Sequence, residues 1–190
     1  MKRSGNNRGY TLLEVLIGLF LTGLIAAAGF EFYATMHNQR IVQEDISDMQ
    51  LNARNSLQEI VQTLRMGGYK IGTHPAFQVT GDSLYVFYSE TQAVDTTLYY
   101  IEDYTTSELS RLDEAPSGLE PRKLMKKVNS DAPAIMADFI RAVRYNVIDS
   151  GTIQIALVTQ ASQPHEDYTS NYGYRLYVAT ERVNLRNIVL

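Results

Sequence analysis

The sequence predicts an α+β protein, in which one long N-terminal helix precedes an antiparallel β-sheet. An apolar run over residues 10–30 is followed by a segment without proline that extends to residue 66. Beyond Gly68 the chain changes to short alternating runs separated by turn residues, which is the pattern of strands. A helix followed by a series of strands is typical of the α+β class. The 190 residues allow one membrane span and one modest domain.

The apolar run is long enough to cross a bilayer, since a helical span needs about 20 residues. Its one charged side chain is Glu14. A carboxylate near the middle of a membrane costs about 2.5 kcal/mol or more, and such groups are usually paired. Glu14 therefore predicts that this helix does not stay alone in lipid.

The nine residues before the run hold three basic side chains and no acidic one. Positive flanks stay in the cytoplasm, which places the N-terminus inside and the rest of the chain outside. A secretory signal peptide is an alternative, with Ala26-Ala27-Ala28 as the place for a cleavage site. Cleavage there would remove Glu14 and most of the apolar helix. A plain single-span anchor is a second alternative.

Between residues 31 and 66, apolar side chains recur at spacings of three and four, which predicts an amphipathic continuation of the helix. This stripe should pack on the sheet and consists of Val42, Ile46, Met49, Ala53, Leu57, Ile60 and Leu64. The face expected to point outward carries Gln43, Asp45, Asp48, Asn52, Asn55, Gln58, Glu59 and Gln62. We expect one helix over residues 10–66 that stops at Gly67-Gly68. Two helices with a break near Gly29 or His37-Asn38 are the alternative.

The remaining chain predicts several strands. Residues 76–80 and 83–88 flank Gly81-Asp82 as one hairpin, and residues 139–148 and 152–159 flank residues 149–151 as another. Further strands are expected at residues 97–104, 108–112, 122–128 and 172–183. The pair Lys126-Lys127 predicts an edge position for residues 122–128. Residues 116–121 are expected to form a loop, and residues 132–139 a short helix or loop.

The start of the apolar run reads Gly9-Tyr10-Thr11-Leu12-Leu13-Glu14 and follows a short basic leader. This pattern resembles the type IV prepilin family, in which Gly precedes an aromatic residue and Glu is the fifth mature residue. The resemblance implies that a prepilin peptidase cuts between Gly9 and Tyr10 and then N-methylates Tyr10. The family more often has Phe at this position. In the family, the residue matching Glu14 pairs with the N-terminal amine of a neighbouring subunit. Glu14 is thus the expected docking residue, since opposite charges attract strongly at low dielectric.

Two further stretches resemble minor pilins. Residues 57–69 are similar to the helix end of PilW-type minor pilins, where an Arg is closely followed by a small residue, Gly and Tyr. Residues 181–187 are similar to the close of PilW-type and J-type minor subunits. PilW-type proteins often carry cysteines, which this chain lacks. The resemblance implies a minor pilin that helps to initiate pilus assembly. A J-type minor pseudopilin of type II secretion and a membrane-anchored binding protein that does not polymerise are the alternatives.

The resemblance also implies an organisation and a location. Residues 1–9 are the leader, 10–30 the transmembrane segment, 31–66 the amphipathic part of the helix and 67–190 a β-rich globular domain. The N-terminus is expected in the cytoplasm and the globular domain in the periplasm or on an extracellular pilus. The implied partners are prepilin peptidase, other major and minor pilins, the inner-membrane assembly machinery and membrane lipid.

Composition argues against several other functions. The chain has a net charge of −4, and without the three basic residues of the leader 14 basic side chains face 21 acidic ones, a net of −7. Nucleic-acid binding normally needs a basic surface. No cysteine is present to form a disulfide or act as a nucleophile. His37, His74 and His165 lack the spacing of metal ligands. No catalytic, cofactor-binding or metal-binding residue is therefore predicted.

Three remaining groups of residues are interpreted as structural. The segment His165-Glu166-Asp167-Tyr168 is expected to be a solvated turn, since it lacks the ligand spacing of a calcium loop. The acidic residues between positions 95 and 114 are interpreted as solvated surface residues in preference to calcium ligands. The 13 tyrosines are read first as sheet residues, with a tyrosine-rich partner surface as the alternative.

Overall fold

The computed structural model describes residues 11–91, 93–105, 120–165 and 171–187. It contains one helix, α1 (Leu12–Met66), followed by a seven-stranded sheet. The strands are β1 (Phe77–Thr80), β2 (Ser83–Tyr88), β3 (Asp95–Asp103), β4 (Arg122–Val128), β5 (Ala134–Asp149), β6 (Thr152–Gln160) and β7 (Leu176–Asn184). The predicted α+β fold, with a long helix and an antiparallel sheet, is confirmed.

The chain divides into two compact units, residues 1–44 and residues 45–190. The first unit holds the apolar part of α1. The second holds the remainder of α1 and the whole sheet. The helix has no break between Leu12 and Met66, so the expectation of one continuous helix is confirmed. Proline, the residue most damaging to a helix interior, is absent from this stretch.

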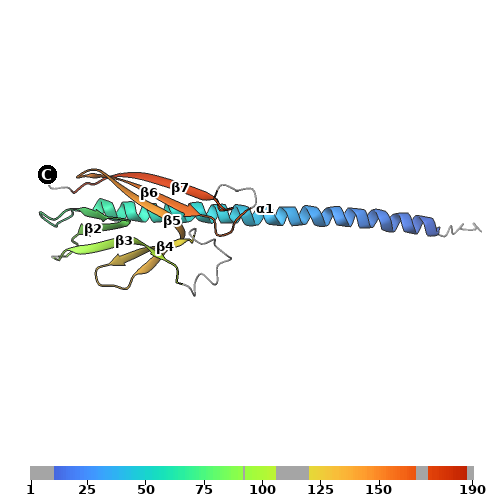
Figure 1. Cartoon of the computed structure of the whole chain (residues 1–190), viewed down its shortest axis with the longest axis horizontal. Helices are drawn as coiled ribbons and strands as arrows, with labels where there is room; N and C mark the ends of the chain where they lie inside the picture. Colours follow the sequence, from blue (N-terminus) through green and yellow to red (C-terminus); the bar gives the residue numbers. More distant parts are fainter. Residues whose placement is uncertain (1–10, 92, 106–119, 166–170, 188–190) are drawn as a thin grey trace, which may run out of the picture. The chain divides into compact units, whose positions relative to one another are not determined.

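The sheet is an antiparallel meander, in which each strand pairs with the next along the chain in the order β1 to β7. Figure 1 shows the cyan-to-green part of α1 running along these strands. Within residues 45–66 the predicted stripe faces the sheet, because Ala53, Ile60 and Leu64 are fully buried. They pack in one core with inward-facing strand residues that include Leu84, Tyr99, Leu124, Ile140, Ile155 and Leu157.

Polar contacts also join the helix to the sheet within residues 45–190. The Thr63 and Tyr99 hydroxyl groups are hydrogen-bonded at 2.7 Å inside the core. The Oδ1 atom of Asp45 accepts hydrogen bonds from the backbone N–H of Ser162 at 3.0 Å and from its hydroxyl group at 2.7 Å. The outward orientation predicted for Asp45 is therefore wrong, because this carboxylate binds the segment after β6.

The predicted edge position of residues 122–128 is also wrong. The strand boundaries are correct, but β4 is the fourth of seven strands and pairs with β3 and β5. The Lys126 ammonium group lies 2.6 Å from a carboxylate oxygen of Glu59 on α1, which compensates its charge inside the sheet. Glu59, expected to point outward, is half-buried as a result.

A second lysine of β4, Lys123, is 6% exposed, and its ammonium group lies 5.0 Å from the centre of the Tyr104 ring. Lysine can thus occupy a central strand where its stem is covered and its charge has a partner.

Of the expected helix or loop at residues 132–139, residues 132–133 are loop and residues 134–139 are instead the start of β5. Pairing with β4 overrides the helix propensity of this alanine-rich segment. Asp138 and Phe139 stand opposite the single residue Lys123, which makes a β-bulge, and Phe139 has φ 56°. The last strand begins at Leu176, four residues later than predicted, because Tyr172 and Gly173 form a turn with positive φ. Both predicted hairpins are confirmed. The strand expected at 108–112 and most of the loop at 116–121 lie outside the described residues.

Candidate functional site

The first turn of α1 places the acidic residue singled out by the sequence. The Oε2 atom of Glu14 accepts hydrogen bonds from the Thr11 backbone N–H at 3.0 Å and from the Thr11 hydroxyl group at 3.1 Å. The Glu14 backbone N–H lies 3.2 Å from the Thr11 hydroxyl oxygen, to which it donates. This reciprocal pair is a capping box, which satisfies backbone donors that the helix itself leaves without acceptors.

The position of Glu14 at the start of α1 also stabilises its negative charge. It is the acidic residue in the first turn of α1, where the helix dipole stabilises negative charge. Both hydrogen bonds from Thr11 use Oε2 of Glu14, and Oε1 forms no hydrogen bond with a described residue. Gly9 and Tyr10, the predicted cleavage and methylation residues, lie outside the described part of the chain.

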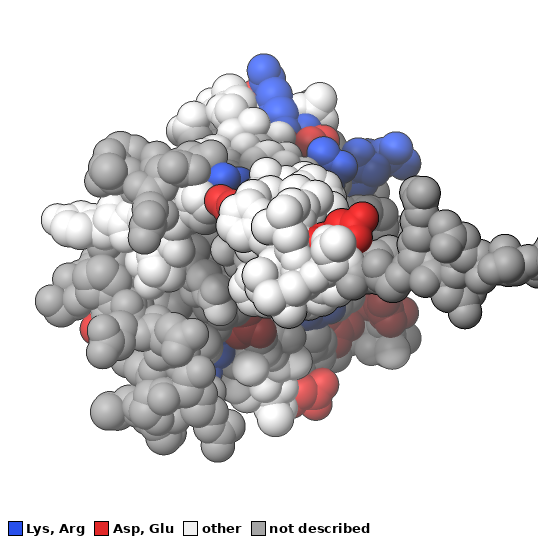
Figure 2. Space-filling model, turned by 90° about the vertical axis from the view of Figure 1, so that its right-hand side faces the viewer, with Lys and Arg blue, Asp and Glu red and all other residues white. Residues whose placement is uncertain are grey.

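The helix around Glu14 presents an apolar surface. Leu12 is 80% exposed, and large apolar side chains are exposed along α1 through Met36 and Ile41. Figure 2 views the chain from the end at which α1 begins, and the surface at its centre is mostly free of charged side chains, with a small red patch. By length and composition, α1 is able to cross a membrane, and none of its most apolar window is buried within the protein. Such a surface needs lipid or other helices as its surroundings.

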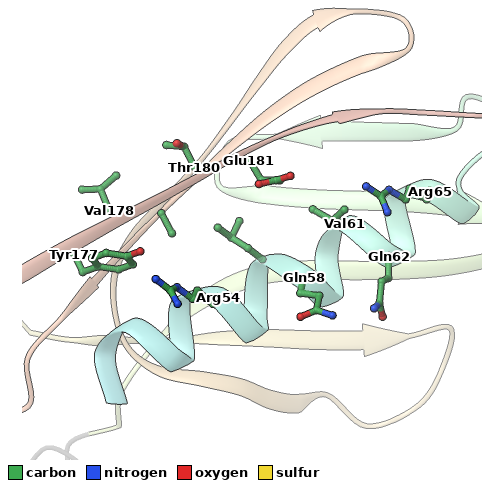
Figure 3. A pocket seen from close by; sticks show the side chains of 11 residues that line it. Arg54, Gln58, Val61, Gln62, Arg65, Tyr177, Val178, Thr180 and Glu181 are labelled. Carbon is green, nitrogen blue, oxygen red and sulfur yellow. The ribbon is translucent and has the colours of Figure 1, made fainter. Parts of the chain in front are cut away.

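A second candidate surface lies between α1 and β7, wholly within residues 45–190. It is an open groove of about 580 Å³ that the sequence analysis did not predict. Figure 3 shows Arg54, Val61 and Arg65 on the helix side and Tyr177, Val178 and Glu181 on the strand side. The two sides are distant in sequence, and only the fold brings them together. The last strand, β7, has one edge without a neighbouring strand, and this edge lies beside arginines of α1. No sequence signal gives this arrangement, because strand order cannot be read from the sequence.

The other chemistry-bearing side chains do not assemble into a site within the described residues. No group of three or more His, Cys, Asp or Glu side chains is placed to hold a metal ion in that part of the chain. His37 stacks on Tyr33 in α1, and the backbone N–H of His165 donates to the Gly173 carbonyl at 2.7 Å. Asp95 accepts a hydrogen bond from the Asn129 side chain, a structural contact between β3 and the turn after β4. Residues 166–168 of the expected turn are outside the described chain.

The tyrosines in the described part of the chain do not form one surface. Tyr88, Tyr99 and Tyr174 are buried, whereas Tyr172 is 72% exposed. Tyr85 stacks on Phe87 along β2. Burial of several rings favours the structural interpretation of those residues over a shared partner surface.

Comparison with known proteins identifies the N-terminal segment. Residues 4–30 match a family described as the prokaryotic N-terminal methylation motif. No curated protein and no solved structure matched the chain. The matched residues contain Gly9, Tyr10 and Glu14 and the first part of the apolar helix. The motif and the long apolar helix that follows it support a type IV prepilin-like N-terminus.

Proposed function

We propose that the chain is a PilW-like minor pilin, which prepilin peptidase processes and which helps to initiate assembly of a type IV pilus. The match of residues 4–30 to the N-terminal methylation motif carries the proposal. A helix that is apolar in its first half and covered by a sheet in its second half supports it. The protein would be anchored in the inner membrane, with its N-terminus in the cytoplasm and its globular domain in the periplasm or on the pilus.

In this proposal the N-terminus acts in two steps. Cleavage between Gly9 and Tyr10 creates an amine on Tyr10, which is then N-methylated. Glu14 docks on the corresponding amine of a neighbouring subunit as the apolar helix leaves the bilayer for the fibre core. Thr11 occupies one carboxylate oxygen of Glu14 and leaves the other for this amine. A charge pair in an apolar surrounding is favourable only when both partners are present.

One alternative belongs to the same machinery. The similarity of residues 181–187 to J-type subunits favours a minor pseudopilin of type II secretion as the second candidate. Deletion of the gene separates the two functions: loss of surface pili supports the first, and loss of protein secretion with pili intact supports the second. A membrane-anchored binding protein that does not polymerise would retain its leader and enter neither fibre.

Replacement of Glu14 tests the docking role. We expect Glu14→Ala to insert into the membrane normally but to enter sheared pili at about one-tenth of the wild-type level, because loss of a desolvated charge pair of 1.4 kcal/mol is a tenfold effect. The matched control is Glu31→Ala, which removes an exposed carboxylate from the same helix. Immunoblots of membranes and of sheared pili measure both quantities.

Mass spectrometry of the same samples separates processing from docking. The mature protein should begin at N-methylated Tyr10 in the wild type and in the control. Undiminished incorporation of Glu14→Ala would contradict the docking role. An unprocessed or otherwise cleaved wild-type N-terminus would overturn the proposed function as a whole.

A further inference from the structure

The groove between α1 and β7 combines an apolar floor with a strand edge. Its floor is formed by Leu57 and Val61 of α1 and by Ala179 of β7. Figure 3 places Arg54 below Tyr177 and Arg65 beyond Val61, so that the two arginines mark the ends of the helix side. The other side is the edge strand itself.

The open edge of β7 carries backbone groups without partners among the described residues. β7 is the last strand of the sheet and pairs with β6. The Arg175 carbonyl accepts a hydrogen bond from the backbone N–H of Ala161, and the backbone N–H of Leu185 donates a hydrogen bond to the Gly151 carbonyl. Because ladder bonds in an antiparallel pair involve alternate residues, the odd-numbered residues of β7 face β6. The N–H and C=O groups of Val178 and Thr180 therefore point to the open edge.

This edge lacks the usual protection against pairing. Its first five residues, Leu176-Tyr177-Val178-Ala179-Thr180, contain no charge, proline or glycine. The pairing with β6 has no bulge, and Val178 is 57% exposed. The other edge strand, β1, has four residues, a length that itself limits pairing. A nine-residue edge strand that pairs regularly with its neighbour and is uncharged over its first five residues is a template for an added strand.

The charged residues that line the groove indicate which kind of strand could bind there. Arg54 and Arg65 are both exposed and lie three helical turns apart, or about 16 Å along one face. Glu181 is the one acidic residue among those that line the groove. In the described part of the chain, neither arginine forms an ion pair. The lining thus carries a net charge of +1 in a protein whose net charge is −4.

We propose that this groove binds an extended acidic segment of a partner protein as an eighth strand on β7. The main chain of the segment pairs with the outward N–H and C=O groups of β7. Carboxylates four residues apart on the segment lie about 13 Å from each other on one face, within reach of Arg54 and Arg65. Small apolar side chains between them cover Leu57, Val61 and Ala179. Strand addition beside a helix is an established mode of peptide recognition.

The observations favour a foreign acidic segment over β7 of a second copy. β7 carries Glu181 and Arg182 and is therefore neutral overall. Such a strand would pair with the edge but would not supply the negative charge that the two arginines favour. The proposal does not depend on N-terminal processing, because every residue that it uses lies within residues 45–190.

The test measures peptide binding to the full chain in detergent micelles by fluorescence anisotropy. The probe is a nine-residue labelled peptide of alternating Val and Thr with Glu at its third and seventh positions, and the control carries Lys at those positions. We expect saturable binding of the Glu peptide, at least about tenfold weaker binding of the Lys peptide, and weakening by salt. Equal binding of both peptides, or binding of neither, would overturn the proposal.

Three variants locate the binding. Val178→Pro removes an outward N–H and preserves the bonds to β6, so it should weaken Glu-peptide binding at least about tenfold without changing the urea midpoint. Arg54→Glu should weaken it by about tenfold, whereas Arg144→Glu, an exposed control on β5, should not. If Val178→Pro unfolds the protein, the Arg54→Glu comparison still decides. Dimerisation of the chain through β7, with no Glu-peptide binding, would replace the acidic segment by a second copy.

Discussion

Glu14 caps its own helix, and in the proposed function the same side chain also docks a neighbouring subunit. An ionised carboxylate has two acceptor oxygens. In the structure, Thr11 occupies Oε2 with its backbone N–H and its hydroxyl group. The cap fixes the direction of the carboxylate before any second subunit arrives. Thr11 is therefore a positioning residue for the proposed docking contact.

Thr11→Val should loosen the first turn of α1. The variant retains the backbone N–H bond to Glu14 but removes the hydroxyl that donates to Glu14 and accepts from its N–H. Loss of a capping side chain costs about 1 kcal/mol, so amide exchange at residues 12–15 should quicken by about fivefold. Hydrogen exchange in lipid nanodiscs measures this effect.

Two further substitutions serve as controls for the cap. Thr11→Ser retains the hydroxyl and should exchange as the wild type does. Thr22→Val removes a hydroxyl that donates to the Gly18 carbonyl in the same helix and should leave residues 12–15 unchanged. Wild-type exchange in Thr11→Val would show that the backbone contact alone holds Glu14.

At the level of the elements, the sequence predicted those helices and turns that depend on residues close together in the chain. The periodic apolar stripe and the glycines after Met66 predicted the second half of α1 and its end. Turn residues predicted both hairpins. The position of β4 within the sheet was not predictable, because Lys126 reads as an edge signal until Glu59 is known to face it. The groove was missed for the same reason, since Arg54 and Tyr177 meet only after the sheet has formed.

The end of α1 depends on Gly68. This residue has φ +82°, and a Cβ atom there would lie 2.1 Å from the Asn187 carbonyl oxygen. We expect Gly68→Ala to lower the free energy of unfolding by about 3 kcal/mol or more, from backbone strain and from displacement of the segment after β7. Gly72→Ala is the matched control, with φ +65° in open space, and should cost about 1 kcal/mol. Urea unfolding of the full chain in detergent gives both values, and equal losses would show that the close approach to Asn187 is unimportant.

At the level of the whole molecule, one helix carries two kinds of hydrophobic surface. Its first part is apolar on every side and remains exposed, which is the pattern of a helix surrounded by lipid or by other helices. Its last part is apolar on one stripe, which the sheet covers. The change from one pattern to the other was readable from the sequence, because a stripe predicts a protein neighbour and a full apolar circumference predicts a membrane or a bundle.

The stability of residues 45–190 as a unit should fall in alkali. Burial raises the pKa of Tyr99 and of Tyr145 above the ordinary value of 10.0. Below pH 10 both side chains are protonated in the folded and the unfolded chain, so they add no pH dependence. As the pH rises above 10, the unfolded chain releases these protons first, and the folded state loses up to about 1.4 kcal/mol of stability per pH unit for each tyrosine.

Tyr145→Phe should remove about half of this pH dependence of stability. The substitution removes no hydrogen bond, because the Tyr145 hydroxyl has no partner among the described residues. Tyr172→Phe, at an exposed ring, should preserve the full slope. Urea midpoints measured from pH 9 to pH 11 compare the three proteins, and a Tyr145→Phe slope as steep as that of the wild type would contradict the assignment of the alkaline loss to these two rings.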